Sequence, residues 1–108
     1  MSKYQLGEFE EIVLLTVAIL NGEAYGVAIV DEIEKRLKRK VSLGAMQTSL
    51  RRLEEKGLLK SEFGAATKER GGKRKRFFNL TKLGKTALKE AKEQRMGLWG
   101  AVPEFVLN

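Results

Sequence analysis

"GGKRKRFFNLT", residues 71–81, is the stretch that decides how this chain folds. Two glycines precede four consecutive cations, and two phenylalanines follow the cations at once. Glycine lets a backbone turn without steric strain, so the glycine pair and the strand-forming residues after it indicate a β-hairpin. Aromatic side chains anchor such a hairpin to a core, while cations at its tip project outward to where phosphates are bound. The stretch therefore predicts a basic hairpin tip that is firmly held.

The remainder of the sequence is mainly helical, because apolar residues recur at helical spacing. We expect helices over residues 6–22, 25–40, 43–57 and 82–99, and paired strands over residues 58–64 and 75–80. A short extended segment is expected around Val41. The predicted fold class is mainly α with a small antiparallel β-hairpin. It comprises a winged helix-turn-helix domain at residues 1–80, with one long C-terminal helix and a tail at residues 81–108, as one compact unit.

The apolar residues also predict which sides of the elements are buried. The first helix is apolar on most sides, which predicts a buried helix and no binding surface. The next two helices have narrower stripes, with these predicted core residues: Val27, Ile29, Val30, Ile33 and Leu37, then Leu43, Met46, Leu50 and Leu53. In the second strand Phe78 faces the core. Phe77 is open to two interpretations, packing under the hairpin or contact with a partner.

The composition argues against catalysis and metal binding. The 108 residues include no cysteine and no histidine, which excludes disulfides and the commonest metal ligands and general base. Neighbouring glutamates such as Glu54 and Glu55 do not face each other on a helix. We expect no enzyme, no catalytic residues, no metal and no cofactor.

The longest apolar run is far below the ~18 residues that span a bilayer, and the first residues do not resemble a secretion signal, so we expect a cytoplasmic protein with no membrane partner.

Charge is unevenly distributed along the chain. Residues 1–34 hold one basic and seven acidic side chains, whereas residues 35–108 hold twenty basic and seven acidic ones. This segregation favours one face built for a polyanion, although solvated helix faces are the simpler alternative. The run Lys38-Arg39-Lys40 is equally open to two interpretations, complementing a helix dipole or contacting phosphate.

The third helix and the hairpin tip together indicate a partner, double-stranded DNA. Ser42 is a good N-cap for that helix, whose outer face combines amide, hydroxyl and guanidinium groups suited to a major groove. The candidate DNA-binding residues of the helix are Ser42, Gln47, Thr48, Arg51 and Arg52. In a winged helix-turn-helix domain the hairpin is called the wing. The candidate DNA-binding residues of the wing are Arg70, Lys73, Arg74, Lys75 and Arg76.

The last helix has a narrow stripe of small and apolar residues on an otherwise charged surface. Such a helix is typical of one half of a two-helix contact, so we expect a homodimer. The candidate interface residues are Leu83, Ala87, Leu88, Ala91, Leu98 and Trp99. Met96 and Trp99 are also candidates for lining a pocket for a small aromatic effector, unless they simply pack the dimer contact.

Three segments resemble the PadR family of bacterial transcriptional regulators: "AYGVAI" at 24–29, "VSLGAMQTSLRRLEEKGLL" at 41–59 and "ERGGKRKRFFNLTKLG" at 69–84. The resemblance covers roughly residues 6–95 and is closest to the smaller branch with a single C-terminal dimerisation helix. It implies a winged-helix DNA-binding domain, a dimer formed by that helix, and repression of a nearby promoter, in some members relieved by a small molecule. Gln47 departs from the family, which usually has a DNA-contacting tyrosine there, and Phe77 and Phe78 stand where tyrosines are common.

The leading hypothesis is therefore a homodimeric, sequence-specific repressor that binds a palindromic operator. Two alternatives stay open at this point. A non-specific nucleic-acid binder fits the charge equally well, although it has no need of the glutamine and threonine on the third helix. A winged-helix protein-interaction module would use the acidic N-terminal part or the apolar tail instead.

Overall fold

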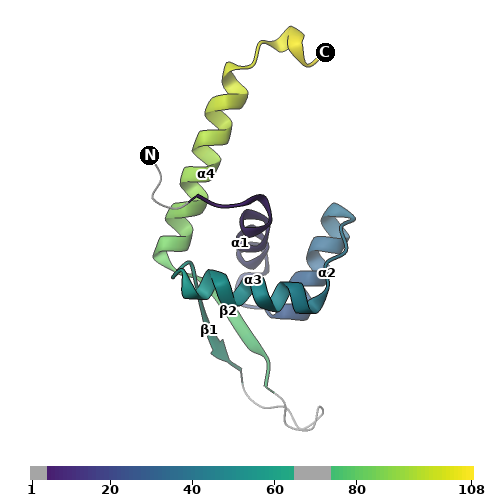
Figure 1. Cartoon of the computed structure of the whole chain (residues 1–108), viewed down its shortest axis with the longest axis vertical. Helices are drawn as coiled ribbons and strands as arrows, with labels where there is room; N and C mark the ends of the chain where they lie inside the picture. Colours follow the sequence, from purple (N-terminus) through teal and green to yellow (C-terminus); the bar gives the residue numbers. More distant parts are fainter. Residues whose placement is uncertain (1–4, 65–73) are drawn as a thin grey trace.

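The computed structural model describes residues 5–64 and 74–108. The elements, in chain order, are α1 (Glu8–Leu20), α2 (Gly26–Leu37), α3 (Leu43–Glu55), β1 (Leu59–Phe63), β2 (Arg76–Leu80), α4 (Lys82–Ala101) and a short 3-10 helix, η2 (Glu104–Val106). Figure 1 shows α1, α2 and α3 grouped together, with the hairpin below them and α4 rising away from the group. The predicted fold class, three helices followed by a hairpin and one long helix, is confirmed.

The hydrophobic core lies where α1 meets α2, α3 and the hairpin. Helix α1 contributes Val13, Leu14 and Val17, none more than 2% exposed. The other elements and their flanks contribute Ala24, Ile29, Ile33, Met46, Leu50, Leu53, Leu58, Leu59, Phe78 and Ala87. Because α1 contacts both helices of the helix-turn-helix and also β2, it fixes their mutual arrangement.

Several predicted core residues are in fact exposed. The expectation that α1 is buried on most sides is wrong for one face, where Leu15 and Ile19 are 45% and 48% exposed. Val27, Leu37 and Leu43 are 45–50% exposed, because each lies near a helix end or on its outer side, where no neighbouring element covers it.

Helix α2 ends at Leu37, before the basic run that was expected to belong to it. Lys38 adopts a left-handed conformation with φ of 55°, which a continuing α-helix cannot accommodate. Within the segment expected to be extended around Val41, Ser42 has an extended backbone, with φ of −70° and ψ of 150°, but no β-strand is formed there. The chain between α2 and α3 is thus a short irregular turn that delivers Ser42 to the start of α3.

The hairpin is tied to the helical body through its second strand. The strands run antiparallel, with Lys60 opposite Asn79. The Phe78 amide donates to the Ala24 carbonyl at 2.8 Å, so the α1–α2 connection covers the outer edge of β2. The Phe77 ring meets Tyr25 edge-on, with centroids 5.7 Å apart. Of the two interpretations of Phe77, the structure therefore supports packing under the hairpin.

A tight joint connects the hairpin to α4. The Thr81 hydroxyl donates to the Gly57 carbonyl at 2.6 Å and accepts from the Gly84 amide at 3.0 Å, which caps α4. The backbone of Gly84 lies so close to β1 that a Cβ added there would be 2.1 Å from the Leu58 carbonyl oxygen. Only glycine permits this approach without moving the helix.

Beyond this joint α4 projects from the molecule as an arm. The radius of gyration is 16.2 Å, whereas a compact domain of this size has about 13 Å. The helix continues through Gly97 and Gly100 to Ala101, slightly past its expected end at residue 99. Its first turns pack on the core through Ala87, while its last turns are exposed (Figure 1).

The Gly84 joint gives a first prediction. Gly84→Ala should lower the free energy of unfolding by about 1–3 kcal/mol, because the added methyl group would force α4 away from Leu58. Gly97→Ala is the matched control on the same helix, since a Cβ there meets nothing within 4 Å. Its greater helix propensity should stabilise the protein or leave it unchanged. Equal melting temperatures for the two variants in thermal denaturation would contradict this account of the joint.

Candidate nucleic-acid interface

Helix α3 presents one polar face to solvent because its other face is held in the core. Met46, Leu50 and Leu53 are fully buried. On the opposite side Gln47, Arg51 and Arg52 are exposed and Thr48 is half-buried. Gly44 and Ala45 precede them on the same exposed side, so the first turns of α3 carry little bulk. A face with short side chains at one end and donor groups along it is able to approach base edges in a major groove.

The individual side chains of this face are already partly organised. The Ser42 hydroxyl caps α3 by accepting from the Ala45 amide at 3.1 Å, and Thr48 donates to the Gly44 carbonyl at 3.1 Å. Both predicted hydroxyl residues thus have local partners. Arg51 is 3.8 Å from Glu55 in an exposed pair, which holds it weakly. Arg52 is exposed on the same helix.

Gln47 lies across the start of α2. A Cβ added at Gly26 would be only 2.7 Å from Gln47 Nε2. Gly26 is buried in the first turn of α2, so its lack of a side chain makes room for this amide. Gln47 therefore lies in the notch between the two helices, with its side chain exposed on the outer surface.

The wing cations fall into three groups. Arg70 and Lys73 lie outside the described residues. Arg74 is exposed at the start of the returning segment. Lys75 and Arg76 have partners within the protein: Lys75 Nζ lies 4.4 Å from the centre of the Tyr25 ring, and Arg76 bonds to Ser61 and Glu54.

The acidic first turn of α1 binds cations from three other parts of the chain. Glu8 pairs with Arg39 at 2.8 Å, Glu10 with Lys56 at 2.5 Å, and Glu11 with Arg95 at 2.7 Å. The acidic and basic halves of the sequence are therefore interleaved in space. No local sequence pattern indicates these pairs, because the partners lie 31 to 84 residues apart.

The contacts of Arg39 add a third interpretation of the basic run Lys38-Arg39-Lys40, namely that it packs against another part of the protein. Arg39 stacks over the Phe9 ring at 5.3 Å as well as pairing with Glu8. Its guanidinium is thus held against α1. Neither of the two interpretations considered from the sequence includes this contact.

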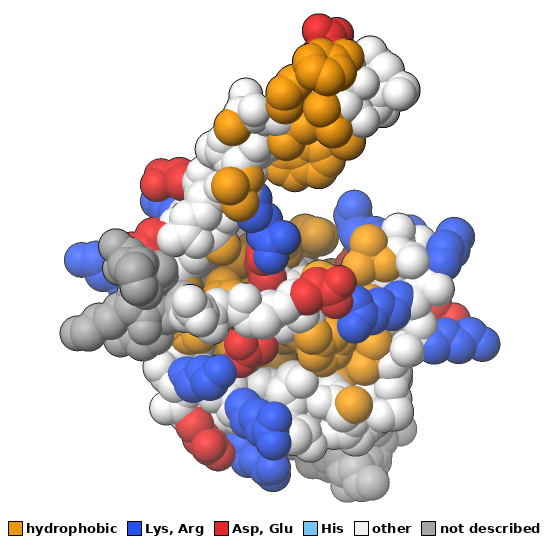
Figure 2. All heavy atoms as spheres, turned by 45° about the horizontal axis from the view of Figure 1, so that its top comes forward, with side chains coloured by type: hydrophobic (Ala, Val, Ile, Leu, Met, Phe, Trp, Pro, Cys, Tyr) orange, Lys and Arg blue, Asp and Glu red, His pale blue; other side chains and the backbone are white. Residues whose placement is uncertain are grey.

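The predicted interface residues of α4 fall into two groups, one near the start of the helix that is packed or half-buried and one near its end that is exposed. Ala87 is buried, and Leu83 and Leu88 pack against the core of their own protomer. Ala91 is half-buried. Leu98 and Trp99 are 71% and 63% exposed on the arm. Figure 2 shows hydrophobic side chains gathered at this end of the molecule, and the exposed large residues there are Met96, Leu98, Trp99, Val102, Phe105, Val106 and Leu107.

Met96 and Trp99 do lie together, in an open groove of 550 Å³ between α1 and α4. Its apolar lining also includes Leu15 and Leu88, and its polar lining is Glu11, Lys89, Lys92 and Arg95. The contribution of α1 to this groove was missed, because Leu15 was expected to be buried.

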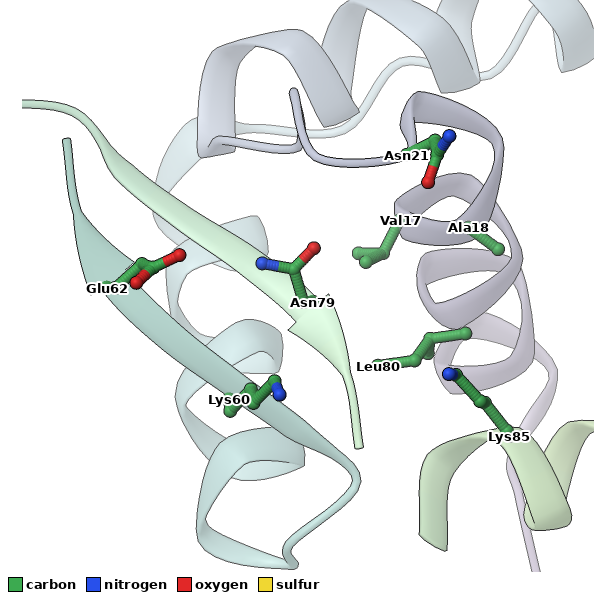
Figure 3. A pocket seen from close by; sticks show the side chains of 8 residues that line it. All are labelled: Val17, Ala18, Asn21, Lys60, Glu62, Asn79, Leu80 and Lys85. Atoms are coloured by element: carbon green, nitrogen blue, oxygen red, sulfur yellow. The ribbon is translucent and has the colours of Figure 1, made fainter. Parts of the chain in front are cut away.

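A second groove, of 440 Å³, lies between α1 and the hairpin. Figure 3 shows Asn79 and Val17 pointing toward each other across it, with Lys60 and Lys85 at its rim. Side chains alternate along a strand, and Ser61 bonds to Glu54 of α3, so Lys60 projects from the opposite face of the sheet. Lys60 is thus directed away from α3.

The comparisons with known proteins identify the family. The model of the family described as "Transcriptional regulator PadR-like family" matches residues 14–90. The chain belongs to this family. Its fold is that of a DNA-binding transcriptional regulator, and the family is one of transcriptional regulators. No curated protein matches the chain.

Solved structures agree with this assignment. A PadR family transcription regulator from Clostridium difficile R20291 is 30% identical, with a TM-score of 0.69 over 88% of this chain and 97% of that one. A PadR-like transcription factor from Bacteroides fragilis is 26% identical, with a TM-score of 0.69 over 83% and 82% of the two chains. Bacillus subtilis PadR, solved in complex with operator DNA, is 16% identical and shares the fold, with a TM-score of 0.63 over 89% of this chain and 51% of that one.

Two other kinds of structural feature are absent from the described residues. Among the helices of residues 5–64 and 74–108, none is both long and apolar enough to cross a membrane. Within the same residues of this PadR-like chain, no group of three or more acidic side chains is placed to hold a metal ion.

Glu10 gives a prediction about acid stability. Burial raises the pKa of its carboxyl group, but hydrogen bonds from Lys56 and the Gly7 amide and the charges of Lys56 and Arg52 outweigh burial, so the pKa lies below its ordinary value of 4.5. A carboxyl group whose pKa is lowered in the folded state stabilises the protein at pH values above the pKa that the same group has in the unfolded state. This contribution is lost as the pH falls through the pKa that the group has in the folded state.

We therefore expect the free energy of unfolding to fall as the pH drops below about 4.5, with roughly 0.5 kcal/mol of the loss due to Glu10 after solvent screening. Glu10→Gln should lack that part of the loss, and Lys56→Met should reduce it, because each removes one side of the pair. Urea denaturation at pH 7 and at pH 3.5 measures this. Identical pH dependence in all three proteins would contradict the assignment.

Proposed function

We propose that the protein is a homodimeric repressor that reads a palindromic operator, with α3 of each protomer in a major groove and the wing on the flanking backbone or minor groove. The observation that carries this proposal is the exposed polar face of α3. A protein that bound only phosphates would need cations there, whereas this face combines an amide, a hydroxyl and two guanidinium groups behind a turn with small side chains.

In this proposal Gln47 and Arg52 read bases or adjacent phosphates. A glutamine amide pairs well with adenine, and arginine pairs with guanine or phosphate. Gln47 lies beside Gly26 at the start of α2 and is exposed, so its amide is available at the outer surface of the two helices. Arg74 would contact the flanking backbone from the wing. Ser42 and Thr48 would shape and cap the helix, and their hydroxyl oxygens keep the capacity for a further hydrogen bond.

The arm of α4 supports a dimer of two copies. Apolar side chains that are exposed by 60% or more and lie together are typical of an interaction surface. The second copy is the occupant we propose, because a two-fold axis would let each arm cover the exposed face of α1 of the other protomer. Two-fold symmetry would then place the two copies of α3 on half-sites about 10 bp apart, or a multiple of that spacing.

Repression follows most simply if the operator overlaps a promoter, since a bound dimer would exclude polymerase from that DNA. We further propose that a small aromatic effector relieves repression by occupying the groove that contains Met96 and Trp99. Trp99 is the single tryptophan of the chain, so quenching of its fluorescence by planar aromatic compounds tests this part.

Operator binding is tested by selecting genomic fragments that the purified protein retains, and then measuring fluorescence anisotropy with the selected duplex and a scrambled one. We expect a preference of at least ~10³ for the selected duplex. Gln47→Ala should reduce that preference by about tenfold, since it removes one base contact. Arg52→Ala should weaken binding further. Lys60→Ala is the matched control, because it removes an exposed cation from the opposite face of the hairpin.

The same titration separates the competing functions. Equal affinity for selected and scrambled duplexes, falling steeply with salt, would establish a non-specific nucleic-acid binder. No binding to any duplex would favour the protein-interaction module. A reporter gene under the selected promoter tests the sign of regulation, and its expression should rise when Arg52→Ala replaces the unsubstituted protein.

The dimer gives its own prediction. Leu98→Glu should shift sedimentation at micromolar concentration from dimer toward monomer, because it places a charge in the apolar contact without disturbing the protomer core. Operator affinity should fall at least tenfold as the second half-site contact is lost. Gln94→Glu, an exposed polar position one turn earlier, should remain dimeric. Monomeric unsubstituted protein that still reads a full palindrome would contradict the geometry.

A further inference from the structure

Arg76 stands at a junction of three elements. Its Nε donates to the Ser61 hydroxyl of β1 at 2.8 Å, and its Nη2 donates to Glu54 Oε1 of α3 at 3.2 Å. The Ser61 hydroxyl in turn donates to Glu54 Oε2 at 2.6 Å. Glu54, Ser61 and Arg76 therefore form a closed triangle, which we call the wing brace. It joins the last turn of α3, the recognition helix of the proposed DNA complex, to both strands of the wing.

Aromatic rings further restrict the guanidinium of Arg76. Its central carbon lies 5.4 Å from the centre of the Phe63 ring and 5.8 Å from that of Phe78. A guanidinium with two hydrogen-bonded partners and two neighbouring rings has few alternative positions. Both oxygens of the Glu54 carboxylate are also occupied. The Arg76 side chain is 51% exposed, but these contacts hold its guanidinium against the hairpin, whereas the sequence indicated only a DNA-contacting cation there.

The hairpin needs such a brace because two strands alone are marginally stable. Its base is held by the core residues Leu59 and Phe78, but toward the tip Phe63 is 59% exposed. One face is supported where Phe77 meets Tyr25. The wing brace supports the other face, where β1 passes the end of α3. With supports on both faces, the wing has a defined angle to the recognition helix.

We propose that Arg76 and Glu54 are positioning residues for DNA binding: the wing brace sets the angle between α3 and the wing, and Arg76 acts through Glu54 and not through a phosphate. This inference rests on the proposed function, because it assigns how the same interface is organised. It reverses the usual expectation for a carboxylate beside DNA. Removing the Glu54 charge should weaken binding, although it removes electrostatic repulsion from the phosphates.

The test compares operator binding of five variants by fluorescence anisotropy across a series of salt concentrations. We expect Glu54→Gln and Arg76→Gln each to weaken specific binding about tenfold, and the double variant to be no weaker than either single one, since the two residues form one unit. Arg76→Lys should also lose most of the affinity, because it keeps the charge but not the two-pronged geometry. Glu55→Gln is the matched control on α3 and should bind as well as the unsubstituted protein, or better.

The salt dependence decides between positioning and phosphate contact. A positioning role leaves the slope of log affinity against log salt unchanged in Arg76→Gln. A phosphate contact lowers that slope by about one and leaves Arg76→Lys close to the unsubstituted protein. The second pattern, or tighter binding by Glu54→Gln, would overturn the proposal.

A measurement without DNA keeps this inference separate from the proposed function. The Gly64 amide donates to the Lys75 carbonyl at 2.8 Å, just beyond the wing brace toward the tip. Its hydrogen exchange should accelerate several-fold in Glu54→Gln and Arg76→Gln alike, and stay unchanged in Glu55→Gln. Unchanged exchange in all variants would overturn the brace. Failure of the unsubstituted protein to prefer any duplex would instead remove the proposed function.

Discussion

The contact between the Gly84 backbone and the Leu58 carbonyl is the constraint on which the shape of the protein depends. Leu58 leads from α3 into β1, and Gly84 lies in the first turn of α4, so their close approach locks the start of the arm onto the base of the wing. Thr81 closes the joint with hydrogen bonds to Gly57 and Gly84. The direction of the arm is therefore set at the same point from which the wing extends. A shift of the joint would move the arm and the DNA-binding unit relative to each other.

Helix α1 makes a second set of contacts that connect the parts of the protein. Its apolar side fills the core, and its acidic first turn pairs with Arg39 after α2, Lys56 after α3 and Arg95 on α4. Individually such partly exposed pairs contribute little stability. Together they connect the helix-turn-helix to the arm through one short segment that also borders the groove lined by Met96 and Trp99. Glu11 and Arg95 themselves line that groove.

The cations of α3 and of the wing differ in their contacts within the protein. Arg52 and Arg74 are directed to solvent, whereas Lys75 and Arg76 are held by Tyr25 and by the wing brace. A basic cluster in the sequence thus combines groups that we propose meet the DNA with groups that hold the wing in place. The aromatic residues after the cluster have the anchoring role expected of them, with Phe78 in the core and Phe77 against Tyr25.

The sequence by itself determined the order of elements, the cap at Ser42, the buried face of α3 and the family, because these depend on residue types and spacing within single segments of the chain. Only the tertiary structure decided which charges have partners and which apolar residues remain exposed. Glu54 and Arg76 are 22 residues apart, and Glu10 and Lys56 are 46 apart, so no periodicity relates them. Leu15 and Leu43 carry the same helical spacing as their buried neighbours. They are exposed because the fold leaves those positions without a covering element within the protomer, and a helical pattern records the face of a residue but not whether anything lies opposite it.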